Sequence, residues 1–71
     1  MLNADKLRGR IVEKRLTLAQ VAAMLGINVT TLHRKLAGET EFTRTEIQKL
    51  AEILELTFGD VQLIFFAPGV E

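Results

Sequence analysis

Five segments of the chain begin with the same helix-start pattern, and this repetition most constrains the fold. In the pattern an apolar residue precedes a Ser, Thr, Asn or Asp cap, and a polar and then an apolar residue follow three and four positions after the cap. The cap oxygen accepts a backbone N–H that the first helical turn leaves unpaired. The segments are Leu2–Leu7, Leu16–Val21, Ile27–Leu32, Phe42–Ile47 and Leu56–Val61. Five starts in 71 residues predict five short helices and no sheet, an all-α fold.

Glycine and apolar spacing place the helices more closely. Gly26 and Gly38 are expected to end the second and third helices. The expected spans are about residues 4–15, 18–25, 29–37, 44–55 and 58–65. The first start is the weakest, because Lys6 occupies the polar position of the pattern. We expect one domain over residues 1–67, closed by Pro68-Gly69, and a short frayed tail over 68–71.

Apolar residues at helical spacing predict the core. The expected inward-facing residues are Leu7, Ile11, Val21, Ala22, Leu25, Leu32, Leu36, Ile47, Leu50, Ala51 and Leu54. We assign them to packing and to no ligand.

Composition excludes several classes of protein. There is no cysteine, and His33 is the only histidine, so we expect no disulfide, no metal site and no cofactor. No apolar run approaches the roughly 20 residues that span a bilayer, and the N-terminus lacks a signal peptide's apolar stretch. Nothing resembles a nucleophile–base pair or a phosphate-binding loop. The sequence predicts a soluble cytoplasmic protein that is not an enzyme, with no membrane partner and no small-molecule substrate.

The stretch from Thr17 to Leu36 predicts a DNA-reading unit. One short helix ends at Gly26 and the next begins only two residues later, at its cap Asn28. So short a link needs a residue with positive φ, which glycine adopts at little steric cost. The two helices then cross steeply, as in a helix-turn-helix. In that motif the second helix enters the major groove of DNA and the first lies across the DNA backbone. Double-stranded DNA is the expected partner.

The side chains of this unit suggest how DNA would be read. Because Leu32 and Leu36 point inward, the opposite side of the helix is expected to meet base edges, through Val29, Thr30, His33 and Arg34. Expected phosphate contacts are Thr17, Thr31, Lys35, Thr43 and Arg44. The alternative is that His33 and Arg34 are ordinary solvated helix residues.

Charge is distributed unevenly although the net charge is zero. Residues 1–38 carry seven basic and two acidic side chains, whereas residues 39–71 carry two basic and seven acidic ones. A molecule with such a charge dipole can present a basic face to phosphates. The alternative is that so few charges are unevenly distributed by chance. Glu39 and Glu41 would repel phosphate, so their loop is expected to stay clear of DNA.

Several segments resemble a known family. Thr17, Val21-Ala22, Leu25–Ile27, Leu32 and Leu36 resemble the repressor/Cro-type helix-turn-helix of phage lambda-like regulators. Residues 6–14, 32–38, 42–47 and 64–66 are similar to a family of small phage and prophage proteins of Gram-positive bacteria. The resemblance implies a five-helix repressor-like domain that regulates phage or prophage transcription. By motif position it also places Asn28 beside Val29, Thr30, His33 and Arg34 at the DNA.

One residue departs from that family pattern. Leu18 stands where many relatives have a glutamine that supports a DNA contact, and a leucine side chain cannot make that contact.

The end of the chain and its acidic half leave alternatives open. Residues 61–67 are unusually apolar, and either they fold back over the core or Leu63, Ile64, Phe65 and Phe66 form a dimer surface. A two-fold homodimer would set its reading helices roughly 34 Å apart. The second functional hypothesis is a protein-interaction module, such as an antitoxin or anti-repressor, that keeps the fold.

Overall fold

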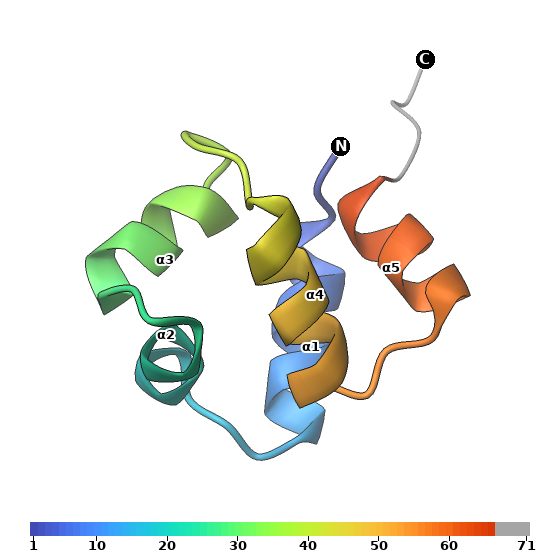
Figure 1. The fold of residues 1–71 in the computed structure, drawn as a ribbon, viewed down its shortest axis with the longest axis horizontal. Helices are drawn as coiled ribbons and strands as arrows, with labels where there is room; N and C mark the ends of the chain where they lie inside the picture. Colours follow the sequence, from blue (N-terminus) through green and yellow to red (C-terminus); the bar gives the residue numbers. More distant parts are fainter. Residues whose placement is uncertain (67–71) are drawn as a thin grey trace.

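Five α-helices and no strand make up residues 1–66, the part of the chain that the computed structural model describes (Figure 1). They are α1 (Ala4–Glu13), α2 (Leu18–Leu25), α3 (Val29–Leu36), α4 (Arg44–Ile53) and α5 (Phe58–Phe65). In Figure 1, α1 and α4 occupy the centre, with α2 and α3 on one side and α5 on the other. The all-α prediction is confirmed. Pro68-Gly69 and the expected tail lie outside the described residues, so the domain boundary stays a prediction.

Each helix begins at the cap that the sequence predicts. The cap side chains accept a backbone N–H from the residue three positions on, and the caps are Asn3, Thr17, Asn28, Thr43 and Thr57. At the three threonine caps the bond is reciprocal, because the side chain of the third residue accepts the N–H of the cap. Local sequence therefore fixes where every helix starts.

At the start of α1, the backbone N–H of the cap Asn3 has a different kind of partner. The Asn3 side chain accepts the N–H of Lys6 at 3.1 Å, but a lysine at this position cannot accept the cap's own N–H in return. The Asn3 N–H instead donates to the carbonyl oxygen of Ile64 at 2.6 Å. This bond ties the first residues of the chain to the last turn of α5, beside which the N-terminus lies in Figure 1.

The helix ends show where the predicted spans are too long. Helices α1 and α4 each stop two residues before the predicted end, because Arg15 and Glu55 adopt φ values of +58° and +56°. These left-handed residues begin two turns of the same kind, each leading through a leucine to a threonine cap. The Lys14 ammonium contacts the Glu55 carboxylate at 2.7 Å, which links the two turns.

The core lies between the helices and follows the predicted apolar stripes. Its buried members are Leu7, Ile11, Val21, Ala22, Leu25, Leu32, Leu36, Leu50, Leu54, Ile64 and Phe65. Ile47 and Ala51, also expected inside, are only half-buried. Of the two alternatives for the apolar end of the chain, the dimer surface is wrong for Ile64 and Phe65, because Ile64 is fully buried and Phe65 is 7% exposed, both within the core. Phe65 packs edge-on against Phe42, with ring centroids 5.6 Å apart.

The link between α2 and α3 depends on the backbone of Gly26. Gly26 has a φ of +78°, and its N–H donates to the carbonyl of Ala23 at 3.1 Å. The next N–H, that of Ile27, donates to the carbonyl of Ala22 at 3.0 Å. The chain thereby changes direction within two residues, and Asn28 caps the start of α3.

We expect Gly26→Ala to destabilise the fold by about 1–2 kcal/mol, which is the cost of holding an L-residue in the left-handed region. No atom lies within 4 Å of the Cβ position at Gly26, so a steric clash would not contribute. Urea unfolding followed by circular dichroism measures the change.

Gly9→Ala provides the matched control, because Gly9 lies inside α1 and its Cβ would also meet open space. Alanine there should stabilise the protein by about 0.5–1 kcal/mol. Equal effects of the same sign from the two substitutions would contradict this account of the turn.

Candidate nucleic-acid interface

Helix α3 presents one side to solvent. Leu32 and Leu36 are buried, and the opposite side carries exposed Val29, Thr30, His33 and Arg34. The structure therefore brings these four predicted base-contacting residues together on one helical surface. Asn28 is exposed at the start of the same helix, where its side-chain oxygen accepts the Thr31 N–H at 2.8 Å. Contact of these residues with bases stays a prediction.

The predicted phosphate-contacting residues are spread over α2, α3 and α4. The hydroxyls of Thr17 and Thr43 each accept a backbone N–H at 3.1 Å, and both residues are exposed. Their own N–H groups are already taken by Gln20 and Glu46 at 2.8 and 2.9 Å. Outward contacts at these caps must therefore use the hydroxyls or neighbouring groups. Of the other predicted phosphate contacts, Thr31 is half-buried and Arg44 is exposed.

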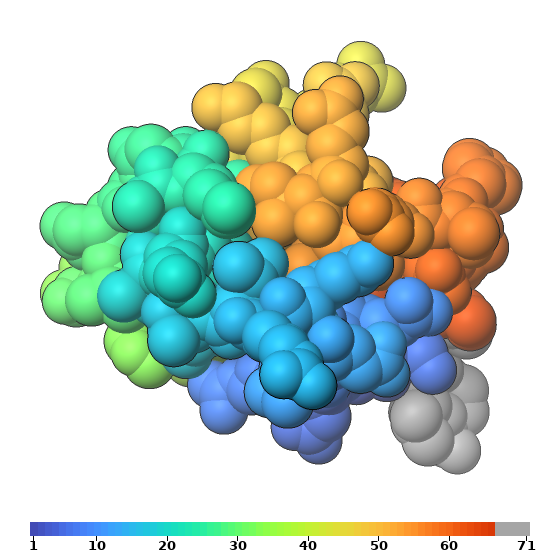
Figure 2. All heavy atoms as spheres, turned by 90° about the horizontal axis from the view of Figure 1, so that it is seen from below, coloured from blue at the N-terminus to red at the C-terminus, as the bar shows by residue number. Residues whose placement is uncertain are grey.

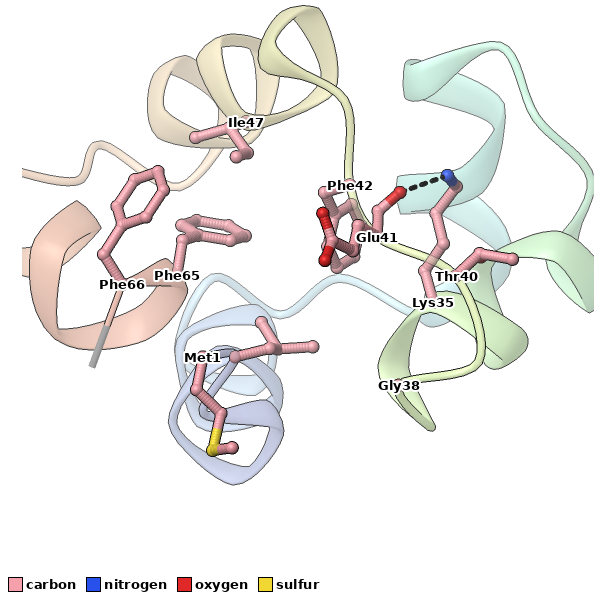
Figure 3. Close-up of a pocket in the computed structure, with 10 residues that line it drawn as sticks. Met1, Lys35, Gly38, Thr40, Glu41, Phe42, Ile47, Phe65 and Phe66 are labelled. Carbon is pink, nitrogen blue, oxygen red and sulfur yellow. Dashed lines mark hydrogen bonds between the residues drawn. The ribbon is translucent and has the colours of Figure 1, made fainter. Parts of the chain in front are cut away.

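Lys35 is not available to phosphate, so the prediction for this residue is wrong. Its side chain is 10% exposed, and its ammonium contacts the Glu46 carboxylate at 3.1 Å. The same ammonium donates to the carbonyl of Glu41 at 3.0 Å, shown by the dashed line in Figure 3, and lies 5.8 Å from the centroid of the Phe42 ring. Lys35 thus joins the end of α3 to the α3–α4 loop and to α4.

Glu46 is the acidic partner in this link. Burial opposes ionisation of its carboxyl, but the Thr43 N–H and the Lys35 ammonium outweigh burial and hold the pKa of Glu46 below its usual value. The charged pair is therefore present at neutral pH. With its ammonium held there, Lys35 also binds the carbonyl of Glu41 in the α3–α4 loop, while the Glu41 side chain remains exposed.

A hollow of about 330 Å³ adjoins the exposed side of α3. It is lined by residues from α1, the α1–α2 turn, the start of α2 and the middle of α3, namely Arg8, Ile11, Val12, Leu16, Thr17, Leu18 and His33. Figure 2, seen from below, shows the end of α1 and the α1–α2 turn on the near face beside α2, with α3 beyond α2. Arg8 and Val12 were missed by sequence reasoning, because helical spacing does not tell which neighbour an exposed side of α1 will face.

The outward side of α5 is apolar. Leu63 and Phe66, two of the predicted dimer residues, are 53% and 54% exposed, and Phe58 is 79% exposed beside them. Gly59 and Gln62 complete this exposed side, which carries no charge. Phe66 also lines a second hollow, of about 510 Å³, with Met1 and Phe42 (Figure 3). Sequence reasoning missed Phe58 because it stands in the first turn, apart from the apolar run at the end of the helix.

Comparisons with known proteins identify one family. A sequence profile described as the Cro/C1-type HTH DNA-binding domain matches residues 6–62, from the first turn of α1 into α5. No curated protein and no solved structure matches the chain. Within residues 1–66, no helix is both long enough and apolar enough to cross a membrane.

We expect Glu46→Gln to destabilise the protein by about 1–3 kcal/mol at pH 7, because it leaves the buried Lys35 ammonium without its counter-charge. The folded pKa of Glu46 lies below its unfolded value, so the pair stabilises the fold above about pH 4.5. That contribution is lost as pH falls through the folded pKa. The deficit of the variant should therefore shrink in acid, as measured by urea unfolding between pH 7 and pH 3.

Glu52→Gln is the control for this experiment, because Glu52 is exposed on the same helix. Its stability should follow the wild type at every pH. Parallel pH profiles for the wild type and Glu46→Gln would contradict a stabilising ion pair.

Proposed function

This chain belongs to the Cro/C1-type helix-turn-helix DNA-binding family, and from that premise we propose that it regulates transcription by reading a specific duplex sequence. The operator is a short palindrome bound by two copies of the chain. The resemblance of residues 6–14, 32–38, 42–47 and 64–66 to small phage and prophage proteins supports a phage or prophage gene as its target.

The exposed side of α3 carries this proposal. Arg34 offers a guanidinium fork that fits guanine O6 and N7, and Thr30 offers a hydroxyl and a methyl group. Val29 is 37% exposed and suits a thymine methyl, while His33 can donate or accept a hydrogen bond. The Asn28 side-chain oxygen caps the helix, so its amide N–H groups are left to face a base.

Contacts to the DNA phosphates would orient α3 in the major groove. Thr17 and Thr31 from the helix-turn-helix, and Thr43 and Arg44 at the start of α4, are the phosphate contacts that we propose. Lys35 has no part in them, because its ammonium is held by Glu46.

The apolar side of α5 supports a homodimer. Phe58, Leu63 and Phe66 form an exposed, uncharged surface, and Gly59 among them lets a second helix approach closely. A two-fold axis through this surface brings like residues of two copies together. Two reading helices then contact one DNA site, which compensates for the zero net charge of each copy.

Selection of bound duplexes from a random DNA pool tests the proposal as a whole. We expect an enriched palindrome with half-sites about one helical turn apart. If no duplex is retained even at low salt, where nonspecific binding is strongest, DNA binding by the isolated chain fails and the protein-interaction alternative gains support.

Arg34→Ala should weaken operator binding by about 1–3 kcal/mol and relax the sequence requirement at one base pair. Fluorescence anisotropy on the selected operator and on its single-base variants measures both effects. Lys49→Ala removes the same charge from an exposed position on α4 and should leave base preference unchanged. A uniform loss on all sequences from Arg34→Ala would show that Arg34 does not read a base.

Leu63→Glu should dissociate the dimer, because it places a charge in the apolar surface of each copy. We expect at least a tenfold rise in the dimer dissociation constant, about 1.4 kcal/mol, measured by sedimentation equilibrium. The control is Gln48→Glu, which adds the same charge at an exposed position on α4. An unchanged dimer constant in Leu63→Glu would exclude this side of α5 as the interface.

A further inference from the structure

The hollow between α1, α2 and His33 combines two surface chemistries. Its walls are mostly hydrocarbon, from Ile11, Leu16 and Leu18 together with Val12, which is 71% exposed. Polar groups come from Arg8, Thr17 and His33. A hollow of this kind fits an occupant with an apolar body and a negatively charged end.

Arg8 is the cationic group best placed to meet such an occupant. Within residues 1–66, three other basic side chains are engaged in ion pairs, Arg10 with Asp60, Lys14 with Glu55 and Lys35 with Glu46. Arg8 is exposed and forms no hydrogen bond or ion pair within the described residues. Its guanidinium charge is therefore not neutralised by the fold.

The position of the hollow points to DNA. His33 belongs both to this hollow and to the exposed side of α3, so an occupant here lies beside a helix held in the major groove. A strand bordering that groove presents a deoxyribose, whose C–H groups are apolar, next to a phosphate. Leu18 then has a role that a polar residue would not fill, because it supplies hydrocarbon surface to the sugar.

We propose that this hollow binds one sugar–phosphate unit of the DNA strand bordering the reading helix. The deoxyribose packs on Val12 and Leu18, and the phosphate accepts hydrogen bonds from the Arg8 guanidinium. Helix α1 thereby becomes part of the DNA interface. The inference rests on the DNA binding proposed above and adds a contact to the DNA backbone that joins Arg8 and Val12 of α1 to Leu18 of the helix-turn-helix.

Arg8→Gln tests the phosphate half. The logarithm of the binding constant for a duplex of about 20 base pairs is measured against the logarithm of salt concentration by fluorescence anisotropy. Losing one phosphate contact should reduce the slope by about 0.9 for each copy bound, with a severalfold loss of affinity at 0.1 M salt on every sequence. Lys49→Gln, which removes the same charge from α4, should keep the wild-type slope.

Neutral phosphates locate the contact on the DNA. Duplexes that carry a single methylphosphonate are scanned along each half-site. The wild type should lose affinity at one position where Arg8→Gln shows no further loss. Val12→Ser tests the apolar half, and it should weaken binding about threefold on all sequences without changing the salt slope.

The outcomes separate this inference from the proposed function. If the wild type binds no duplex, the proposed function fails. If the wild type binds and Arg8→Gln matches Lys49→Gln in slope and in the methylphosphonate scan, only the contact at the hollow is overturned. Circular dichroism of each variant verifies that the fold is intact.

Discussion

Helices of eight to ten residues leave about four backbone N–H groups unpaired at each start, so the chemistry of helix starts governs much of this backbone. The acidic residues that complete two of these starts also hold the helices together. Glu46 accepts the N–H of its cap and contacts the ammonium of Lys35 on α3. Asp60 accepts the N–H of its cap and contacts the guanidinium of Arg10 on α1 at 2.7 Å. The Thr57 N–H, with a further contribution from Arg10, holds the pKa of Asp60 below its usual value despite partial desolvation.

This arrangement fixes α3 at both ends, so the side chains on its exposed side are not needed to hold the helix in place. At the start, the Gly26 turn and the Asn28 cap set the direction of the helix. At the end, Lys35 bonds to the loop and to α4. A helix held in this way loses little conformational freedom when its outer side chains meet a partner, and such preorganisation favours affinity. These exposed residues can therefore be substituted at little cost to the fold, as the proposed reading of different DNA sequences requires.

Local features were predictable from sequence, whereas features that depend on the packing between helices were not. The five caps and the left-handed Gly26 follow from residues within a few positions of each other. Helices α1 and α4 end two residues before the approximate predicted ends, because Arg15 and Glu55 are residue types that seldom adopt positive φ. The sequence places Lys35 at a phosphate and leaves Ile64 and Phe65 between core and dimer surface, since the burial of all three depends on elements distant in sequence. Arg8 was missed for the same reason, because only the packing of α1 beside α2 brings it near His33.

The uneven charge distribution has a different meaning once the ion pairs are known. Each of the three pairs joins a basic residue of the first half of the chain to an acidic residue of the second half. Much of the asymmetry therefore serves to close the fold and is neutralised within it. Electrostatic attraction to DNA phosphates is then left to a few basic side chains outside these pairs, including Arg8 and Arg34. Since long-range attraction to DNA is then weak in physiological salt, binding must depend on where those few charges stand, and the proposed homodimer would double their number at one DNA site.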